Sequence, residues 1–318
     1  MNRAASRTCP APDRASLYQE ITDRIIAELE TGRVPWVQPW AASNAPLAMP
    51  QNALTNRCYS GINILILWDT VIQRGFSTQS WLTFRQALSL GGTVRKGERG
   101  TTVVYASRFT PGEAQPVKTG GLDTRASIPF LKRFTVFNTD QCDGLPETLL
   151  PRLPPVPDDM VPPSIDALTK ASGAVVRIGG DMAFYSVTHD YVQVPRPDAF
   201  LVPINFARTL AHELSHWSGS ASRLGRDQSG SFGSKPYFME ECVAELSAAF
   251  VCASLGIVPT VRHADYLGAW LDIMREDNRA IIRAASAASK TADFLLGFLE
   301  DHQAGDKGDP VEGDAQAA

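Results

Sequence analysis

The sequence lacks the features that mark export, membrane insertion and disulfide stapling. Residues 1–14 are polar and contain no apolar signal-peptide core. The longest apolar runs, such as residues 62–68, are far too short to cross a bilayer. The five cysteines include no CxxC pair, and an odd, scattered set is typical of reduced thiols in a cytosol. We therefore expect a cytoplasmic protein with no membrane partner.

The sequence also lacks an excess of positive charge, because its formal net charge is -4 at pH 7. Taken alone, this balance argues against nucleic acid as a partner. The distribution changes that interpretation: residues 1–150 hold 16 Lys and Arg against 12 Asp and Glu, whereas residues 151–318 hold 14 against 22. The basic half is therefore the candidate for binding a polyanion.

Length and proline content together predict two domains. A chain of 318 residues fits two domains of about 100–200 residues each. Six prolines fall within residues 151–164, a stretch that suits a linker and not a helix or central strand. We predict an α+β fold for both domains, at 15–150 and 165–300, with a disordered tail at 301–318.

Hydrophobic periodicity and turn residues place the expected elements. The N-terminal half predicts helices at 17–29, 62–72 and 81–90, and two paired strands at 101–107 and 132–138. The C-terminal half predicts a helix at 165–171, strands at 174–178, 183–187 and 191–194, and helices at 206–217, 237–255, 263–274 and 279–299. The strand at 191–194 is expected to be exposed and able to bind an extended peptide by strand addition.

The segment His212-Glu213-Leu214-Ser215-His216 carries the strongest chemical signal. His212 and His216 lie four residues apart on a predicted helix, so both imidazoles project from one face. Two nitrogens held in this way suit Zn²⁺, and Glu213 is placed to act as general base on a water molecule. Only five histidines occur in the chain, so a chance pairing around a glutamate is improbable.

A catalytic zinc site needs a third protein ligand, and the acidic segment 240–245 is the best source. Glu241 and Glu245 share one helical face. We predict Glu241 as the ligand and Glu245 as the group that orients a histidine. The spacing leaves open the reverse assignment, or Glu240 as the ligand. The expected ion is Zn²⁺, with Mn²⁺ as an alternative.

Aromatic and basic residues are concentrated in the N-terminal half. The aromatic residues are Trp36, Trp40, Tyr59, Trp68 and Trp81, and the interleaved cations are Arg57, Arg74, Arg85, Arg95, Lys96 and Arg99. Stacking aromatics combined with cations describe a surface that binds single-stranded nucleic acid. A core of tryptophans with ordinary surface arginines is an equally good interpretation of the residues alone.

Several motifs together resemble the ArdC-type antirestriction proteins of plasmids and phages, whose N-terminal domain also occurs on TraC-like plasmid primases. The matching segments are 25–32, 35–40, 59–63, 81–87, 94–100, 136–138, 209–217, 223–224 and 240–246. The resemblance covers roughly residues 15–300. It implies an N-terminal domain that binds single-stranded DNA, with Asn63 among its candidate contacts, and a C-terminal zincin-like metallopeptidase domain.

The resemblance also implies that the protein protects incoming plasmid DNA from host restriction during conjugation. It does not identify the protein or peptide substrate. The alternative function is a protein that coats DNA and whose metal is structural or regulatory. Primase-like priming is disfavoured because the chain has no evident acidic cluster for two-metal phosphoryl transfer.

Overall fold

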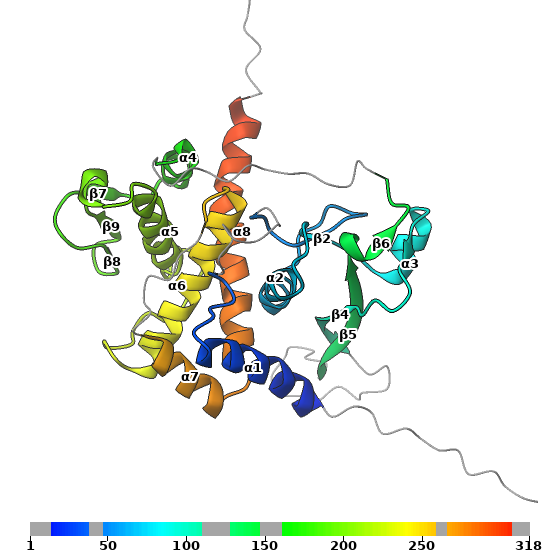
Figure 1. Ribbon diagram of the computed structural model, residues 1–318. Helices are drawn as coiled ribbons and strands as arrows, with labels where there is room; N and C mark the ends of the chain where they lie inside the picture. Colours follow the sequence, from blue (N-terminus) through cyan, green and yellow to red (C-terminus); the bar gives the residue numbers. More distant parts are fainter. Residues whose placement is uncertain (1–13, 38–46, 110–127, 147–160, 259–265, 307–318) are drawn as a thin grey trace, which may run out of the picture.

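The structure of the protein is a computed structural model, which describes residues 14–37, 47–109, 128–146, 161–258 and 266–306 (Figure 1). The long helix α8 (Ala280–Asp306) runs through the middle of the molecule. The strands of the N-terminal half lie on one side of it, and the small sheet of the C-terminal half lies on the other. In the part of the chain described, no helix is both long and apolar enough to cross a membrane.

The N-terminal half is a small mixed sheet packed against helices. Its helices are α1 (Arg14–Glu30), α2 (Ile62–Arg74) and α3 (Phe84–Ser89). The sheet contains β1 (Gln51–Asn52), β2 (Ser80–Leu82), β5 (Ile128–Asn138) and β4 (Thr101–Phe109), in that spatial order. A separate two-stranded sheet pairs β3 (Thr93–Val94) with β6 (Cys142–Asp143). The short 3-10 turn Thr139–Gln141 lies between β5 and β6 in the chain. The predicted α+β class is confirmed.

The predicted pairing of the strands at 101–107 and 132–138 is confirmed, and both strands are longer than predicted. β4 and β5 are antiparallel and stay in register from Thr101 opposite Val136 to Phe109 opposite Ile128. The predicted helix at 81–90 was wrong at its start, because Trp81 and Leu82 pair with β5 as part of β2. Thr83 then caps α3, and its side chain and that of Gln86 bond reciprocally to each other's backbone N–H. That capping box is the local reason why the helix begins at Phe84.

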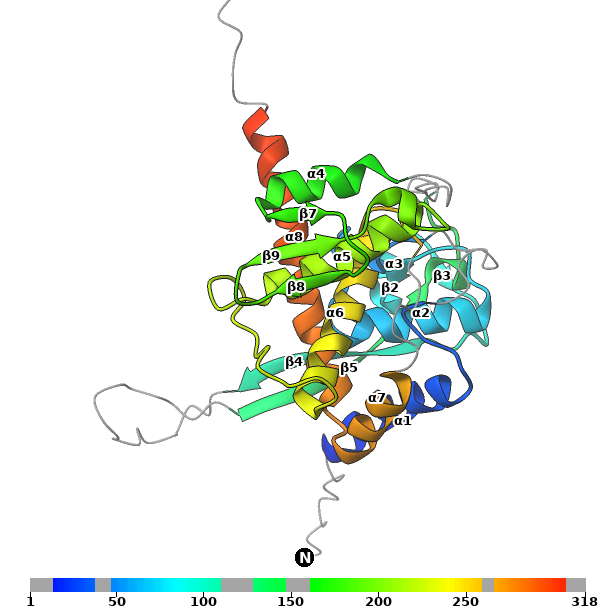
Figure 2. The same ribbon diagram turned by 90° about the vertical axis from the view of Figure 1, so that its left-hand side faces the viewer.

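The C-terminal half places a three-stranded sheet beside a helical bundle (Figure 2). Its elements are α4 (Pro163–Ser172), β7 (Val176–Ile178), β8 (Phe184–Ser186), β9 (Tyr191–Val194), the 3-10 turn Pro197–Ala199, α5 (Ile204–Ser218), α6 (Lys235–Ser254), α7 (Leu267–Glu276) and α8. The strand order is β7-β9-β8. The predicted strand addition at 191–194 was therefore wrong: β9 already has neighbours on both sides, and the edge strands are β7 and β8.

Two predicted boundaries differ from the structure. Pro163 and Ser164, which we assigned to the linker, open α4, since proline fits the first turn of a helix. The predicted tail 301–318 is helical as far as Asp306. The remainder of the predicted tail, residues 307–318, lies outside the described residues, as do residues 151–160 of the predicted linker.

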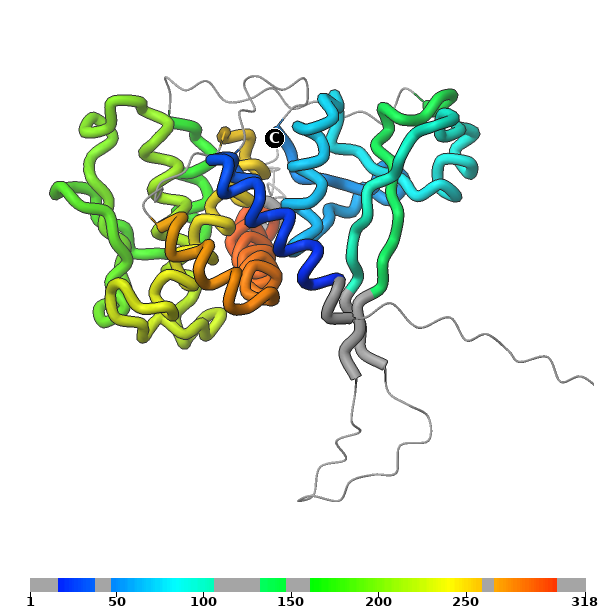
Figure 3. Tube along the Cα trace, turned by 60° about the horizontal axis from the view of Figure 1, so that its bottom comes forward, coloured from blue at the N-terminus to red at the C-terminus, as the bar shows by residue number. Residues whose placement is uncertain are grey.

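The larger hydrophobic core joins the two halves. Trp36 packs on Trp270 of α7, with ring centroids 5.9 Å apart, and Trp68 of α2 packs edge-on against Phe250 of α6 at 5.7 Å. Helix α1 lies against α7 and α8 (Figure 3). Along α8, small buried side chains allow its neighbours to approach closely; they are Ala284, Ala285, Ala288 and Ala292. The helices that carry the metal-site residues are thus packed on the N-terminal half.

Candidate metal centre and nucleic-acid surface

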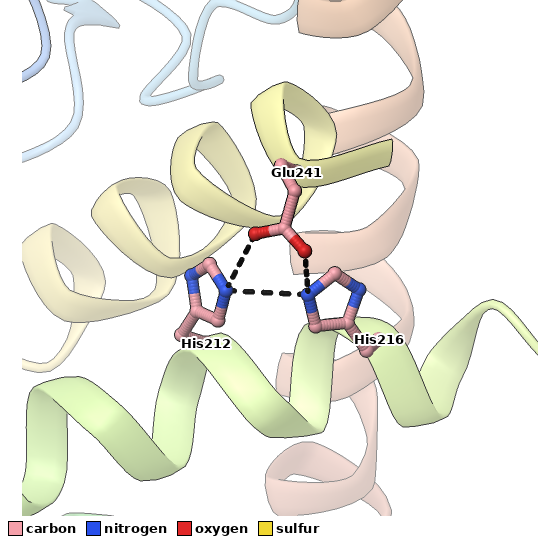
Figure 4. A group of neighbouring side chains, drawn as sticks. All are labelled: His212, His216 and Glu241. Atoms are coloured by element: carbon pink, nitrogen blue, oxygen red, sulfur yellow. Dashed lines mark hydrogen bonds and ion pairs between the residues drawn. The ribbon is translucent and has the colours of Figure 1, made fainter. Parts of the chain in front are cut away.

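Helix α5 presents the two histidines of the predicted metal motif side by side. Buried Leu210 and Leu214 anchor the helix in the core, and a helix repeats after about 3.6 residues, so His212 and His216 share a face. Their Nε2 atoms lie 3.2 Å apart, with the rings nearly perpendicular. Figure 4 shows both rings pointing from α5 toward α6.

Glu241 on α6 completes this group. One carboxylate oxygen lies 3.5 Å from Nε2 of His212, and the other lies 3.6 Å from Nε2 of His216. In Figure 4 the carboxylate faces the space between the two rings. His212, Glu241 and most of His216 are shielded from solvent. The structure therefore brings together the three side chains that the sequence nominated as metal ligands.

The separations between the ligand atoms of the three side chains suit a divalent ion. Ligands bound tetrahedrally at about 2.0–2.1 Å stand about 3.3 Å apart. Here the two Nε2 atoms lie 3.2 Å apart, and each lies 3.5 or 3.6 Å from a different oxygen of the Glu241 carboxylate; taken as one ligand atom per residue, all three lie within 4.8 Å of one another. Imidazole nitrogen combined with carboxylate oxygen suits Zn²⁺ and also accepts other first-row ions such as Mn²⁺. His212, His216 and Glu241 could hold such an ion without rearrangement of the backbone.

The two other acids of the segment lie behind the histidines. Glu245 lies 3.6 Å from Nδ1 of His212, and Glu240 accepts a hydrogen bond from Nδ1 of His216 at 3.2 Å. Such partners fix ring orientation and make the opposite nitrogen a better ligand. Glu245 lies where the sequence prediction placed an orienting group. The corresponding place of Glu240 was not predicted, because the sequence allowed it only as an alternative ligand.

Arg226, in the loop between α5 and α6, fixes the Glu240 carboxylate. Its Nη2 and Nε atoms donate to the two carboxylate oxygens at 2.8 and 3.0 Å. Its remaining hydrogen bonds reach Ser218, the Ser215 carbonyl, and Thr291 on α8. Gly219, which follows the last residue of α5, leaves room for the Arg226 guanidinium. A Cβ at this position would lie 2.6 Å from Nη2 of Arg226. Sequence reasoning missed Arg226, for which the chain offers no local motif.

Charge around the histidines favours a bound cation. Burial alone would lower the pKa of His212, but the nearby carboxylates of Glu241, Glu245 and Glu213 raise it to about 10. Burial alone would raise the pKa of Glu240, yet His216 and Arg226 lower it to about 2. Ionised carboxylates thus outweigh the desolvation of the imidazole. A divalent ion satisfies the same surplus of negative charge.

The three ligand atoms open onto a cleft of about 420 Å³. One wall is formed by β8 and its flanks, and the opposite wall by the start of α6; the lining residues include Phe184, Tyr185, Val187, Pro236, Tyr237 and Tyr266. Glu213 also lines the cleft, next to His212 in sequence, and is otherwise buried. A catalytic zinc site keeps an open coordination position facing a cavity of this kind.

Two tyrosines of the cleft differ in their hydrogen bonding. The Tyr185 hydroxyl donates to Asp190 at 2.8 Å and accepts from Arg223 at 3.1 Å. The Tyr237 hydroxyl lies 3.0 Å from that of Tyr266. Burial and the neighbouring hydroxyl raise the pKa of Tyr237 well above its ordinary value, so the phenol keeps its proton at neutral pH. Tyr237 and Tyr266 thus share a hydrogen bond at the wall of the cleft, and either hydroxyl can be its donor.

Those of the predicted stacking tryptophans that the structure describes are buried. Trp36 and Trp81 have no exposed area, so neither can stack on a base, and that part of the prediction is wrong. Trp81 instead packs edge-on against Phe76 at 6.0 Å, inside the smaller core under the sheet. Trp40 lies outside the described residues. Hydrophobic packing, the alternative left open by the sequence, accounts for Trp36 and Trp81.

The predicted cations are exposed, but they differ in whether an acidic side chain lies beside them. Arg57, Arg85, Lys96 and Arg99 all reach solvent. Arg95 is paired with Glu98 at 2.9 Å and with Asp143 at 3.4 Å. Acidic partners therefore offset part of the positive charge of the segment 94–100.

Tyr59 and Asn63 meet at a separate groove of about 360 Å³ beside β4 and β5. The Asn63 side-chain amide donates a hydrogen bond to the Val104 carbonyl and accepts one from the Val104 N–H, both at 2.8 Å. These two bonds connect α2 to β4. The groove also contains two exposed aromatic residues, Tyr105 and Phe134, which the sequence analysis did not nominate. Strand alternation at 101–107 and 132–138 was the available signal for them.

Comparison with known families divides the chain into two matched regions. Residues 15–137 match the N-terminal domain of anti-restriction factor ArdC. Residues 163–287 match the zincin-like metallopeptidase family. The gap between the two matches, residues 138–162, contains all but the last two residues of the proline-rich segment.

Similar proteins extend over almost the whole chain. An uncharacterized protein, y4eC of Sinorhizobium fredii, is 36% identical over 90% of this chain and 94% of its own length. DNA primase TraC of Escherichia coli is 33% identical over 88% of this chain, which corresponds to only 20% of that protein. A second TraC primase of Escherichia coli matches in the same way over 27% of its length.

Two solved structures have the same fold. Both are crystal structures of the antirestriction ArdC protein from plasmid R388. The metal-free form has 38% sequence identity and a TM-score of 0.75, covering 90% of this chain and 98% of that one. The Mn(II)-bound form has 39% identity and a TM-score of 0.72, covering 89% and 98%.

Proposed function

Because this chain belongs to the ArdC family of antirestriction proteins, we propose that it is a metal-dependent peptidase joined to a domain that binds single-stranded DNA. Together these activities protect incoming plasmid DNA from host restriction during conjugation. The observation that carries the peptidase proposal is the convergence of His212, His216 and Glu241 at an open cleft that also contains Glu213.

The open cleft favours a catalytic ion over a structural one. Structural zinc sites are closed by four protein ligands, usually including cysteine, whereas catalytic sites use three and leave one position for water or substrate. Among the described residues, the group that could hold a metal consists of two histidines and one glutamate. The carboxylates of Glu240 and Glu245 approach the far nitrogens of the histidines, not the Nε2 atoms that Glu241 faces.

The side chains of the cleft support hydrolysis of a peptide bond. A bound divalent ion would supply Lewis acidity for a carbonyl group and acidify water. The Glu213 carboxylate accepts the proton of the attacking water and returns it to the leaving amine. Tyr237 donates a hydrogen bond to the carbonyl oxygen as negative charge develops on it. The edge of β8 can align an extended substrate chain along the cleft.

Glu213→Gln tests the peptidase proposal. The purified protein, loaded with Zn²⁺ or Mn²⁺, is incubated with a mixture of unstructured peptides, and new termini are identified by mass spectrometry. We expect cleavage by the wild type and its loss in Glu213→Gln, with metal content and DNA affinity retained. Equal cleavage by the variant contradicts the general-base role. Restriction protection in cells that survives Glu213→Gln favours the DNA-coating alternative.

The DNA-binding part of the proposal rests on the basic N-terminal half and on the family match at residues 15–137. The chain corresponds to about a fifth to a quarter of the TraC primases it resembles. We therefore do not extend priming to it. Binding of a labelled oligonucleotide by the whole protein, in single-stranded and double-stranded form, tests this part independently of proteolysis.

A further inference from the structure

The groove beside β4 and β5 has an apolar floor set by strand register. Val103 stands opposite Phe134, and Thr101 stands opposite Val136. Residues directly opposite in an antiparallel pair share a face, so Val103, Phe134 and Val136 point the same way. Val103 and Val136 are buried against α2 and form the floor. Tyr105, two residues after Val103 along β4, lies on the same face.

Aromatic rings form the open side of the groove. Tyr105 is 58% exposed and Phe134 is 45% exposed, and the two rings meet edge-to-face with centroids 6.4 Å apart. Half-buried Tyr59 forms part of the inner wall. Exposed aromatic surface of this kind next to a cavity marks a binding site more often than it serves stability.

We propose that this groove binds the bases of single-stranded nucleic acid by stacking on Tyr105 and Phe134. The inference rests on the proposed DNA binding and names the surface that performs it. A volume of about 360 Å³ admits a flat heterocycle, and every base has a π face on which an aromatic ring can stack.

Charge around the groove complements a phosphate backbone. Lys132 stands directly opposite Tyr105, so it belongs to the same face and is exposed. Arg57 and Arg85 are exposed and lie within two positions of the lining residues Cys58 and Thr83. Aromatic platforms bordered by cations are the common arrangement for single strands. Duplex DNA hides its base faces, so it cannot use the same platform.

Two of the polar side chains that line the groove, Asn63 and Thr83, already have hydrogen-bond partners within the protein. The Asn63 amide is engaged with Val104, and the Thr83 hydroxyl is engaged with Gln86. Neither is therefore available to read base edges without giving up an internal bond. Stacking without base-edge hydrogen bonds tolerates any sequence.

The test is binding of fluorescently labelled oligonucleotides of mixed sequence by the full-length protein. The variants are Tyr105→Ala, Phe134→Ala and the double variant, with Phe134→Trp as a substitution that keeps the platform. Each alanine variant should weaken single-strand binding by about tenfold, and Phe134→Trp should retain it. Phe232→Ala is the matched control, because Phe232 is an exposed aromatic residue in the C-terminal half.

The outcomes separate the groove from the proposed function. If the wild type binds no single strand, the proposed DNA binding fails. If the wild type binds and the double variant binds equally well, the groove assignment alone fails. A loss that is the same for duplex and single strand also overturns it, because stacking requires unpaired bases. The metal content of the variants should match the wild type, because both side chains lie outside the metal cleft. Thermal unfolding should show each variant folded at the assay temperature, since both side chains are about half exposed.

Discussion

Arg226→Met should weaken metal binding although Arg226 touches no metal ligand directly. The substitution removes the hydrogen bonds to Glu240, together with those to Ser218, the Ser215 carbonyl and Thr291, and keeps a side chain of similar length in the same packing space. Glu240 then accepts from His216 without its counter-charge. The imidazole loses part of the support that holds its Nε2 atom toward the other two donors.

The expected size of the effect follows from this chain of contacts. Loss of a partner that orients a ligating histidine lowers metal affinity by about ten- to a hundredfold. That range corresponds to about 1.4–2.7 kcal/mol. Glu240→Gln should give a loss of similar size. If Arg226 acts through Glu240, the double variant Arg226→Met/Glu240→Gln should lose little more metal affinity than either single variant, because both substitutions remove the same support of His216.

The assay is competition for Zn²⁺ between the protein and a chromophoric chelator at constant pH. Arg223→Met is the matched control: this arginine stacks 4.0 Å over the Trp217 ring and pairs with Asp190, away from Glu240. Thermal unfolding of the metal-free variants checks that each is folded. A folded Arg226→Met protein with wild-type affinity refutes the reasoning, and fully additive losses in the double variant refute the shared path.

Further predictions concern the third ligand, the shared core, salt and metal removal. Glu241→Gln should abolish stoichiometric Zn²⁺ in elemental analysis, whereas Glu245→Gln should retain weaker binding; the opposite result reverses the two roles. Trp68→Ala should lower the free energy of unfolding by about 3–5 kcal/mol, in one calorimetric transition, because Trp68 packs on Phe250 across the two halves; two separate transitions would show independent cores. The logarithm of DNA affinity should fall linearly with the logarithm of salt concentration, and an affinity independent of salt would exclude phosphate contacts. Chelation should lower the melting temperature, because the ion binds the folded state; an unchanged value would argue that the site is empty in the folded protein.

The sequence by itself determined the features that depend on local spacing. A separation of four residues on a helix sets His212 and His216 on one face in any fold that keeps α5 helical. Alternation and β-branched residues located the strands of the β4–β5 pair. Proline and glycine placed several boundaries because their backbone preferences act within a few residues.

Only the tertiary structure decided which residues meet across the chain. Glu240, Glu241 and Glu245 lie within six positions, and the crossing of α5 and α6 selects which carboxylate faces both Nε2 atoms. Trp81 and Tyr105 are both aromatic residues of the basic half, yet one is buried and the other is exposed. Strand alternation can show which side chains share a face, but burial depends on what packs on that face, and those partners come from distant parts of the sequence.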